Sequence, residues 1–200
     1  MVRLFNIFKN SYTLWCCEIK WFFIVTINSV EGKIIVYYGK GEGKTTASIG
    51  HAIRTLGHNK KVVMLQFMKG RPTTGEYQFL KNLENLQIYL CGAPGFLKDE
   101  ESREKHREKA KEGLKLAHRM LHEKQADLLI LDEILYAVKF ELLTEDEVVE
   151  LLKKRGQTDV ILSGREPGAR IIEMADIATH MEKVKHYWNK ARSTTLAIEY

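Results

Sequence analysis

A glycine-rich stretch placed directly between a strand pattern and a helix pattern constrains this chain more than any other feature. It reads Gly39-Lys40-Gly41-Glu42-Gly43-Lys44-Thr45-Thr46 and follows the apolar run 34–38. Glycines let backbone amides approach phosphate oxygens closely, and the helix that follows presents the positive end of its dipole. Lys44 supplies a mobile cation, and the Thr45 hydroxyl is placed to ligate Mg²⁺. The stretch therefore predicts a nucleotide-binding P-loop.

One residue departs from the usual eight-residue pattern of such loops. The first glycine of the pattern would fall at position 38, which is Tyr38 here. The Gly-Lys-Thr end and the strand–helix context are intact, so nucleotide binding is the favoured interpretation. The alternative is a glycine-rich turn that binds no ligand.

Strand and helix patterns alternate along the rest of the chain. Apolar, β-branched runs predict strands at 34–38, 62–67, 86–90, 128–131 and 160–163. Helices are predicted at 45–56, 75–82, 102–122, 144–154 and 169–174, with Gly57 as a left-handed cap of the first. This alternation implies right-handed crossovers between parallel strands. We expect an α/β fold: a single P-loop (RecA-like) three-layer domain with a mostly parallel central sheet and helices on both faces.

The chain length of 200 residues suffices for one such domain with a proper core. Residues 1–30 are rich in aromatics and poor in turn signals. We expect them to be an N-terminal extension, either non-native or disordered, and the alternative is an arm that covers a neighbouring subunit's site. The P-loop domain itself is expected to span residues 31–200.

Charge and cysteine usage narrow the functional classes. The net charge of +5 is spread among acidic residues, so it favours phosphates mildly without forming the basic stripe of a nucleic-acid-binding protein. Cys16, Cys17 and Cys91 form no C-x-x-C pair, which argues against a disulfide framework and a zinc site. No stretch reaches the roughly 18 apolar residues that span a bilayer, and no signal peptide is recognisable. We expect a cytoplasmic protein that contacts neither membrane nor nucleic acid.

Acidic residues follow the fourth predicted strand. Asp132 and Glu133 come directly after the apolar run 128–131. Ligands of open α/β sheets bind at the carboxyl ends of the strands, and one carboxylate there can hold Mg²⁺ directly or through water. Together with Thr45, this pair makes up the predicted metal site.

Basic and amide side chains follow two other strands. Arg165, after strand 160–163, could stabilise charge on a leaving phosphate chain, or could only form a surface ion pair with Glu166. Gln66 and Lys69 end the second strand on the same side, where Lys69 is either a ligand or a solvated loop lysine.

Two further features have competing explanations. Phe96 ends the glycine-containing loop 92–96, where it would make an apolar ligand contact or, more commonly, fill the core. His106, His118 and His122 lie on the charged helix 102–122. The last two are spaced for a metal, but ordinary surface histidines are the favoured interpretation.

Taken in order, these motifs resemble the P-loop family of cob(I)alamin adenosyltransferases. The resemblance runs from about Gly32 to Tyr200. It also includes Gln66-Phe67-Met68-Lys69-Gly70, Thr74-Gly75-Glu76, Leu131-Asp132-Glu133, Ser163-Gly164-Arg165, Met174-Ala175-Asp176, Val184-Lys185-His186 and Ile198-Glu199-Tyr200.

The resemblance implies an enzyme that moves the 5′-deoxyadenosyl group of ATP to Co(I) of a reduced corrinoid and releases triphosphate. It implies Mg²⁺, a flavin-dependent corrinoid reductase as partner and a homodimer. Lys44, Glu133 and Arg165 would be catalytic, and Phe96 matches the aromatic residue that displaces the lower axial ligand of cobalt. The substrate-binding residues would be Gly39, Lys40, Gly41, Glu42, Gly43, Lys44, Thr45, Thr46, Gln66, Lys69, Phe96 and Arg165.

Four positions depart from the family pattern. Lys98 replaces a common tryptophan, Leu135 a polar residue, and Lys40 and Glu42 the commoner loop residues. The rival enzyme class is a P-loop nucleoside-triphosphate hydrolase or small kinase, which needs the same loop and acidic strand. The non-enzymatic rival is a nucleotide sensor or corrinoid carrier.

Overall fold

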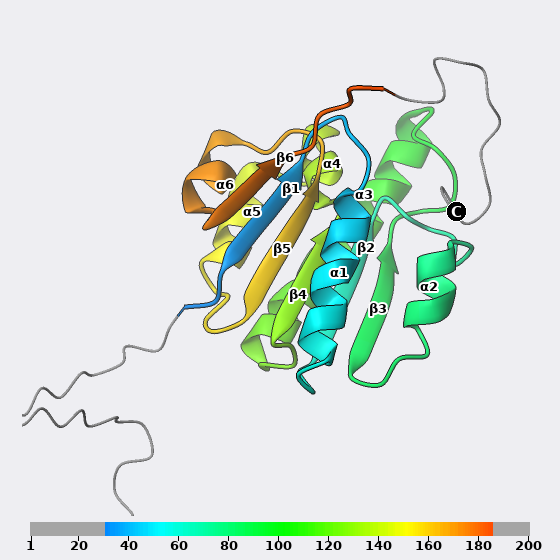
Figure 1. Cartoon of the computed structure of the whole chain (residues 1–200). Helices are drawn as coiled ribbons and strands as arrows, with labels where there is room; N and C mark the ends of the chain where they lie inside the picture. The colour runs from blue at the N-terminus through cyan, green and yellow to red at the C-terminus, as the bar shows by residue number, and fades with distance from the viewer. Residues whose placement is uncertain (1–30, 186–200) are drawn as a thin grey trace, which may run out of the picture. The chain divides into compact units, whose positions relative to one another are not determined.

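Six parallel strands form the central sheet of this computed structural model, which describes residues 31–185. Their order across the sheet is β3-β2-β4-β5-β1-β6 (Figure 1). The strands are β1 Ile34–Tyr38, β2 Val62–Phe67, β3 Leu86–Cys91, β4 Leu128–Asp132, β5 Asp159–Gly164 and β6 Ile177–His180. Parallel neighbours need a crossover, and each crossover here contains at least one helix. The predicted α/β fold is confirmed.

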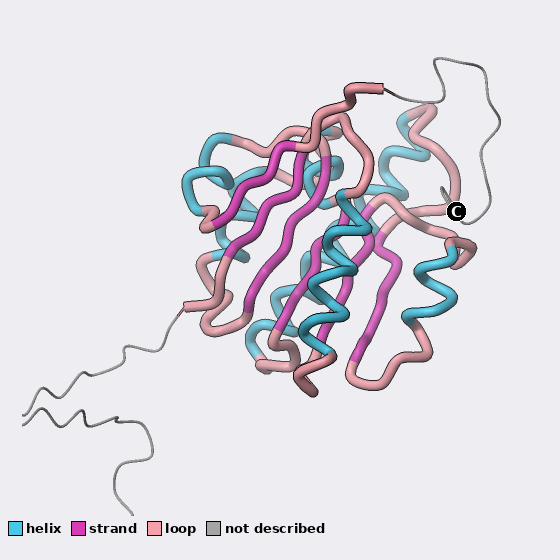
Figure 2. Tube along the Cα trace, in the orientation of Figure 1, coloured by secondary structure: helices cyan, strands magenta, loops and turns pink. Residues whose placement is uncertain are grey.

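Helices cover both faces of the sheet (Figures 1 and 2). They are α1 Lys44–Leu56, α2 Gly75–Leu80, α3 Glu100–His122, α4 Ile134–Lys139, α5 Glu145–Leu152 and α6 Ala169–Met174. Successive strand residues point to opposite faces, so Ile34 and Val36 join the core beneath α3–α6, whereas Ile35 joins the core beneath α1 and α2. The two buried clusters account for the three-layer arrangement.

The predicted elements match the structure closely, with two omissions and one error. The short helix α4 and the edge strand β6 were not predicted. Gly57 is not a left-handed cap, because its φ is −60°, and the left-handed residue of this turn is Asn59 at φ +56°. Asparagine tolerates this conformation better than most residues, so the turn needs no glycine there.

Some sequence predictions lie outside the described residues. They are the N-terminal extension 1–30 with Cys16 and Cys17, and the end of the predicted domain at 186–200, which includes His186 and the last motif 198–200. Cys91 is a buried free thiol, and burial raises its pKa to about 12. Between residues 31 and 185, no helix is both long and apolar enough to cross a membrane.

The parallel arrangement decides where a ligand can bind. The carboxyl ends of all six strands meet at one edge of the sheet, and five of the segments that leave this edge, those after β1 to β5, carry predicted site residues. Strand β5 lies between β1 and β4. It therefore separates the strand that leads into the P-loop from the strand that ends in Asp132.

Candidate active site

The P-loop is anchored to the segments that follow β5 and β6, the two strands on either side of β1. The amide of Gly39 donates to the carbonyl of Arg165 at 2.9 Å, and the amide of Gly41 donates to the carbonyl of Met181 at 2.7 Å. Gly39 has φ +116°, and a Cβ atom built there would lie 2.4 Å from the Met181 oxygen. Only glycine fits this close approach. The amides of Gly39 and Gly41 are therefore both engaged within the protein.

Lys44 lies over the loop it belongs to. Its Nζ donates to the carbonyls of Gly39 at 3.0 Å and Gly41 at 2.5 Å. Burial lowers the pKa of Lys44, and the nearby Glu133 carboxylate opposes that shift. The side chain is only partly buried, so its ammonium can exchange these carbonyls for phosphate oxygens. The other predicted loop residues Lys40, Glu42, Gly43 and Thr46 are exposed.

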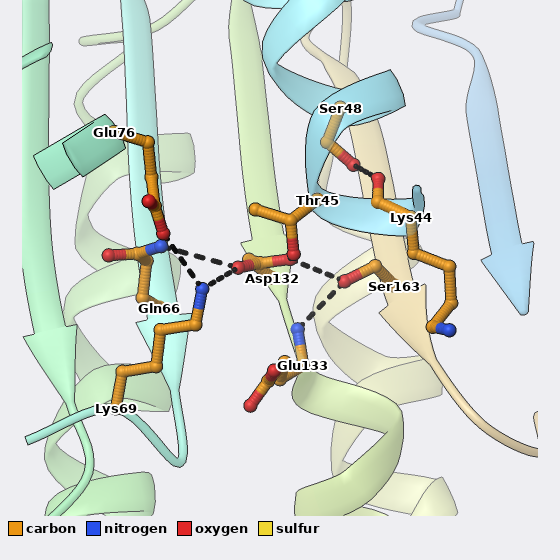
Figure 3. Close-up of polar contacts among 9 residues, drawn as sticks. All are labelled: Lys44, Thr45, Ser48, Gln66, Lys69, Glu76, Asp132, Glu133 and Ser163. Carbon is orange, nitrogen blue, oxygen red and sulfur yellow. Dashed lines mark hydrogen bonds and ion pairs between the residues drawn. The ribbon is translucent and has the colours of Figure 1, made fainter. Parts of the chain in front are cut away.

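The Asp132 carboxylate organises the site, as Figure 3 shows. It has no exposed surface, and each of its oxygens accepts two hydrogen bonds. Oδ1 accepts from Thr45 Oγ1 at 2.9 Å and Ser163 Oγ at 2.7 Å. Oδ2 accepts from Gln66 Nε2 at 3.3 Å and Lys69 Nζ at 3.2 Å. One buried charge thus joins side chains from α1, β2, β5 and the loop after β2.

Glu133 differs from the neighbouring Asp132 in its backbone conformation and in the hydrogen bonding of its carboxylate. It adopts a left-handed conformation, φ 62° and ψ 14°, and its amide donates to Ser163 Oγ at 2.8 Å. Its side chain points away from the Asp132 carboxylate (Figure 3), and within residues 31–185 nothing hydrogen-bonds it. Burial raises the pKa of Glu133 to about 7, Asp132 adds to the rise, and Lys69 and Lys44 oppose it. Glu133 is the carboxylate that remains available to a ligand.

Lys69 is held between two carboxylates. Its Nζ lies 3.2 Å from Glu76 Oε1 and 3.2 Å from Asp132 Oδ2. Burial by itself would lower the pKa of Lys69, but Asp132, Glu133 and Glu76 raise it above the usual value. Lys69 is therefore not a solvated loop lysine. Glu76 and Ser163 were missing from the predicted site residues, although both stood in the sequence motifs.

Arg165 retains unused hydrogen-bonding capacity. Its Nε is buried without a partner in the described part of the chain. The surface ion pair with Glu166 does not form, because the Glu166 carboxylate bonds Lys139 Nζ at 2.8 Å instead. An open pocket of about 570 Å³ lies beside Arg165, between the start of the P-loop and the end of β6. A cation beside an open pocket suits an anionic ligand.

Comparison with known proteins decides what kind of P-loop protein this is. The model of the family "ATP:corrinoid adenosyltransferase BtuR/CobO/CobP" matches residues 30–200. The chain belongs to this family. The curated relatives agree with the match, and their names place them among the transferases rather than the hydrolases or kinases considered above.

Three such relatives carry the name corrinoid adenosyltransferase. The Escherichia coli K12 protein is 37% identical over 171 residues, which are 85% of this chain and 86% of the relative. The Salmonella typhimurium LT2 protein is 34% identical, with the same shares of both chains covered. The Pseudomonas aeruginosa protein is 31% identical over 85% of this chain and 84% of its own.

Two departures from the family pattern have clear positions in the structure. Leu135 is fully buried, and its Cβ lies 2.5 Å from where a side chain on Gly164 would begin, so it packs against the sheet. Lys98 is exposed in the loop that precedes α3. Phe96 in the same loop is 81% exposed, which excludes the core interpretation.

The position of His106 contradicts the prediction that the three histidines of this helix are ordinary surface residues. It is only 2% exposed, and its Nδ1 accepts a hydrogen bond from the Ala93 amide at 3.4 Å. His122 is exposed and His118 partly buried, and no cluster of three metal-binding side chains occurs in the described part of the chain.

Proposed function

We propose that this chain transfers the 5′-deoxyadenosyl group of ATP to the Co(I) centre of a reduced corrinoid. The observation that carries the proposal is the joining of the P-loop to the acidic strand through Thr45 and Asp132, in a chain of the corrinoid adenosyltransferase family. The P-loop supports binding of a triphosphate, and family membership supports its use as the leaving group.

The reaction needs a nucleophile, an electrophile and a stabilised leaving group. The electron pair of Co(I) attacks the ribose C5′, the C5′–O bond breaks, and triphosphate leaves with the bonding electrons. Cobalt is formally oxidised from Co(I) to Co(III), and no proton is transferred. Negative charge rises on the α-phosphate oxygen, so cations at this position lower the barrier. Lys44, Lys69 and Arg165 are cations that the carboxyl edge of the sheet offers for this purpose.

The donor set also suits Mg²⁺, which is commonly bound by one or two carboxylates together with substrate phosphates. The Glu133 carboxylate accepts no hydrogen bond from residues 31–185, and Thr45 has a hydroxyl at the start of α1. We assign these two residues to the metal. Asp132, whose oxygens already accept four protein hydrogen bonds, would orient Thr45 or a metal-bound water. Bound Mg²⁺ would supply charge neutralisation of the triphosphate.

The corrinoid would meet the loop that carries Phe96. An exposed aromatic side chain on a surface loop costs hydrophobic free energy unless a partner covers it, and the flat, apolar face of a corrin ring is such a partner. We infer that Phe96 displaces the lower axial ligand of cobalt and shields the metal from water.

The cellular setting follows from the chemistry. Co(I) is readily oxidised, so a flavin-dependent reductase that delivers the corrinoid in reduced form is the expected partner. We also propose a homodimer and a cytoplasmic location, where ATP is available and thiols such as that of Cys91 stay reduced.

An anaerobic assay with chemically reduced cob(I)alamin, ATP and Mg²⁺ tests the proposal. The corrinoid spectrum and the phosphate product are followed together. We expect a light-sensitive alkylcobalamin and one triphosphate per product, and loss of both in Lys44→Ala. Conversion of ATP to ADP with an unchanged corrinoid spectrum would instead identify a hydrolase or kinase. Binding of both substrates with neither reaction would identify a sensor or carrier.

A further inference from the structure

A small pocket lies between the Phe96 loop and the start of α3, the helix that packs against β2 and β3 (Figure 1). Its volume is about 210 Å³, and the predicted nucleotide site does not use it. The lining residues that matter here are Ala93, Asp99, Glu101, Lys105 and His106. The pocket is large enough for a short polar side chain of a ligand, and too small for a nucleotide or a macrocycle.

His106 lines this pocket and carries an unused hydrogen-bonding atom beside it. Its Nδ1 accepts from the Ala93 amide at 3.4 Å, so in the neutral ring the proton resides on Nε2. Nε2 is buried and has no hydrogen-bond partner in the described part of the chain. A buried donor without an acceptor is unfavourable, and such a group in a native protein generally awaits a water or a ligand. The partner must offer an oxygen that accepts a hydrogen bond.

The charges of the pocket restrict that partner further. Lys105 and Glu101 neutralise each other in a 2.6 Å ion pair. Asp99 keeps its negative charge, because hydrogen bonds from the Ser102 amide and hydroxyl lower the pKa of its carboxyl. The pocket lining thus includes two carboxylates, those of Asp99 and Glu101, and one ammonium, that of Lys105. A carboxylate would be repelled by Asp99, whereas a primary amide offers an oxygen to His106 and N–H groups to Asp99.

We propose that this pocket binds one of the amide side chains at the rim of the corrinoid. His106 donates to the amide oxygen, and Asp99 accepts from the amide nitrogen. The inference rests on the proposed function, since the same loop carries Phe96, which is assigned to the corrinoid face. It makes the enzyme selective for corrinoids whose peripheral side chains are amides over those with free carboxylates at the same position.

Two matched substitutions separate ligand binding from loop anchoring. Asparagine keeps an acceptor near the position of Nδ1 for the Ala93 amide but has no donor at the position of Nε2. Glutamine places its amide nitrogen near Nε2 and gives up the acceptor at Nδ1. We expect His106→Asn to raise the KM for cob(I)alamin by about tenfold, with kcat and the KM for ATP unchanged. His106→Gln should keep the KM for cob(I)alamin within about twofold of the wild type. If His106→Gln instead raised the KM for cob(I)alamin and His106→Asn did not, His106 would only anchor the loop. That result would overturn the proposal.

A second measurement needs no change at His106. Wild-type enzyme is compared on cobalamin and on cobalamin in which peripheral amides are hydrolysed to carboxylates, one position at a time. We expect kcat/KM to fall by about tenfold or more for one position, and Asp99→Asn, which keeps a good helix N-cap, to reduce that discrimination. Equal kcat/KM values for the amide and every carboxylate would overturn the proposal. Failure of the wild type to adenosylate cobalamin at all would instead overturn the proposed function.

Discussion

Asp132 is a carboxylate with no exposed surface, and it accepts hydrogen bonds from four protein donors. A buried carboxylate is tolerated only where hydrogen bonds and a counter-charge replace its hydration. Lys69 supplies the counter-charge, and Ser163 links the carboxylate to the Glu133 backbone. The two adjacent carboxylates therefore differ: Asp132 joins four side chains, whereas the Glu133 carboxylate accepts no hydrogen bond within residues 31–185.

Ser163→Ala should weaken this arrangement. The substitution removes one donor to Asp132 and the acceptor of the Glu133 amide, so we expect the free energy of unfolding to fall by about 1–3 kcal/mol. The KM for ATP should rise as well, because Glu133 loses the contact that fixes its left-handed backbone. Urea denaturation and steady-state kinetics measure the two effects.

Thr73→Ala, which removes an exposed hydroxyl, is the control and should change stability by less than about 0.5 kcal/mol. Unchanged stability of Ser163→Ala would contradict this reading of the cluster.

Glu133→Gln should make the ligand-free protein more stable at high pH. Burial raises the pKa of Glu133 to about 7 in the folded protein, whereas the unfolded chain releases this proton near the usual glutamate pKa of 4.5. Between these values the folded state binds more protons, so the contribution of Glu133 to stability falls as pH rises. At pH 8 we expect the glutamine variant to be more stable than wild type by roughly 1–2 kcal/mol, which allows for partial solvation of the side chain. The gain should vanish at pH 4, and the exposed Glu84→Gln should show no such pH dependence in the same denaturation series.

Among the elements, apolar periodicity predicted five of the strands and the helices that cover them, because those segments bury one face or both. It missed β6, whose four residues are all exposed and whose described strand pairing is with β1 alone. It missed α4 as well, because a helix of six residues is too short to show a clear helical period. A signal for the burial of His106 was present, since it lies four residues before Ala110 and eight before Leu114 on the buried stripe of α3. The partners of Asp132 come from segments far apart in the chain, and no local pattern contains that information.

Gly39→Ala tests the junction of the P-loop with the segment after β6. The new Cβ would collide with the Met181 carbonyl at a backbone conformation that alanine rarely adopts. We expect a loss of about 1–3 kcal/mol in unfolding free energy and weaker binding of an ATP analogue by calorimetry. Gly50→Ala is the matched control, because a Cβ on this residue of α1 meets no atom within 4 Å. That substitution should stabilise the protein by about 0.5–1 kcal/mol. Equal effects of the two substitutions would argue against a steric role for Gly39.

At the scale of the molecule, one topological fact brings the site together. The sheet is parallel throughout, so residues from distant parts of the sequence reach the same edge. The sequence supports this expectation, because alternation of strands and helices favours parallel pairing. The order of strands was not predictable, yet it is what places Ser163 of β5 between the P-loop and the acidic strand.

A chain that begins at residue 31 should fold and bind ATP. All six strands and both buried clusters belong to residues 31–185. We expect the midpoint of thermal unfolding to lie within a few degrees of that of the full chain. Excess Mg²⁺ and a non-hydrolysable ATP analogue should raise it in both proteins, and Lys44→Ala should remove the rise. Aggregation of the shortened chain, or loss of nucleotide binding with Lys44 intact, would show that residues 1–30 are part of the functional domain.

The four donors around Asp132 also bear on how the chain finds its fold. They reach the carboxylate from separate segments, so all are present only when β2, β4, β5 and α1 are correctly aligned. A slip of one residue between two strands would turn Gln66 or Ser163 to the opposite face and leave a charge buried with too few donors. The free-energy cost of such a poorly hydrogen-bonded buried charge destabilises misaligned sheets but not the native sheet. The residue that organises the nucleotide site thus also discriminates against off-register intermediates during folding.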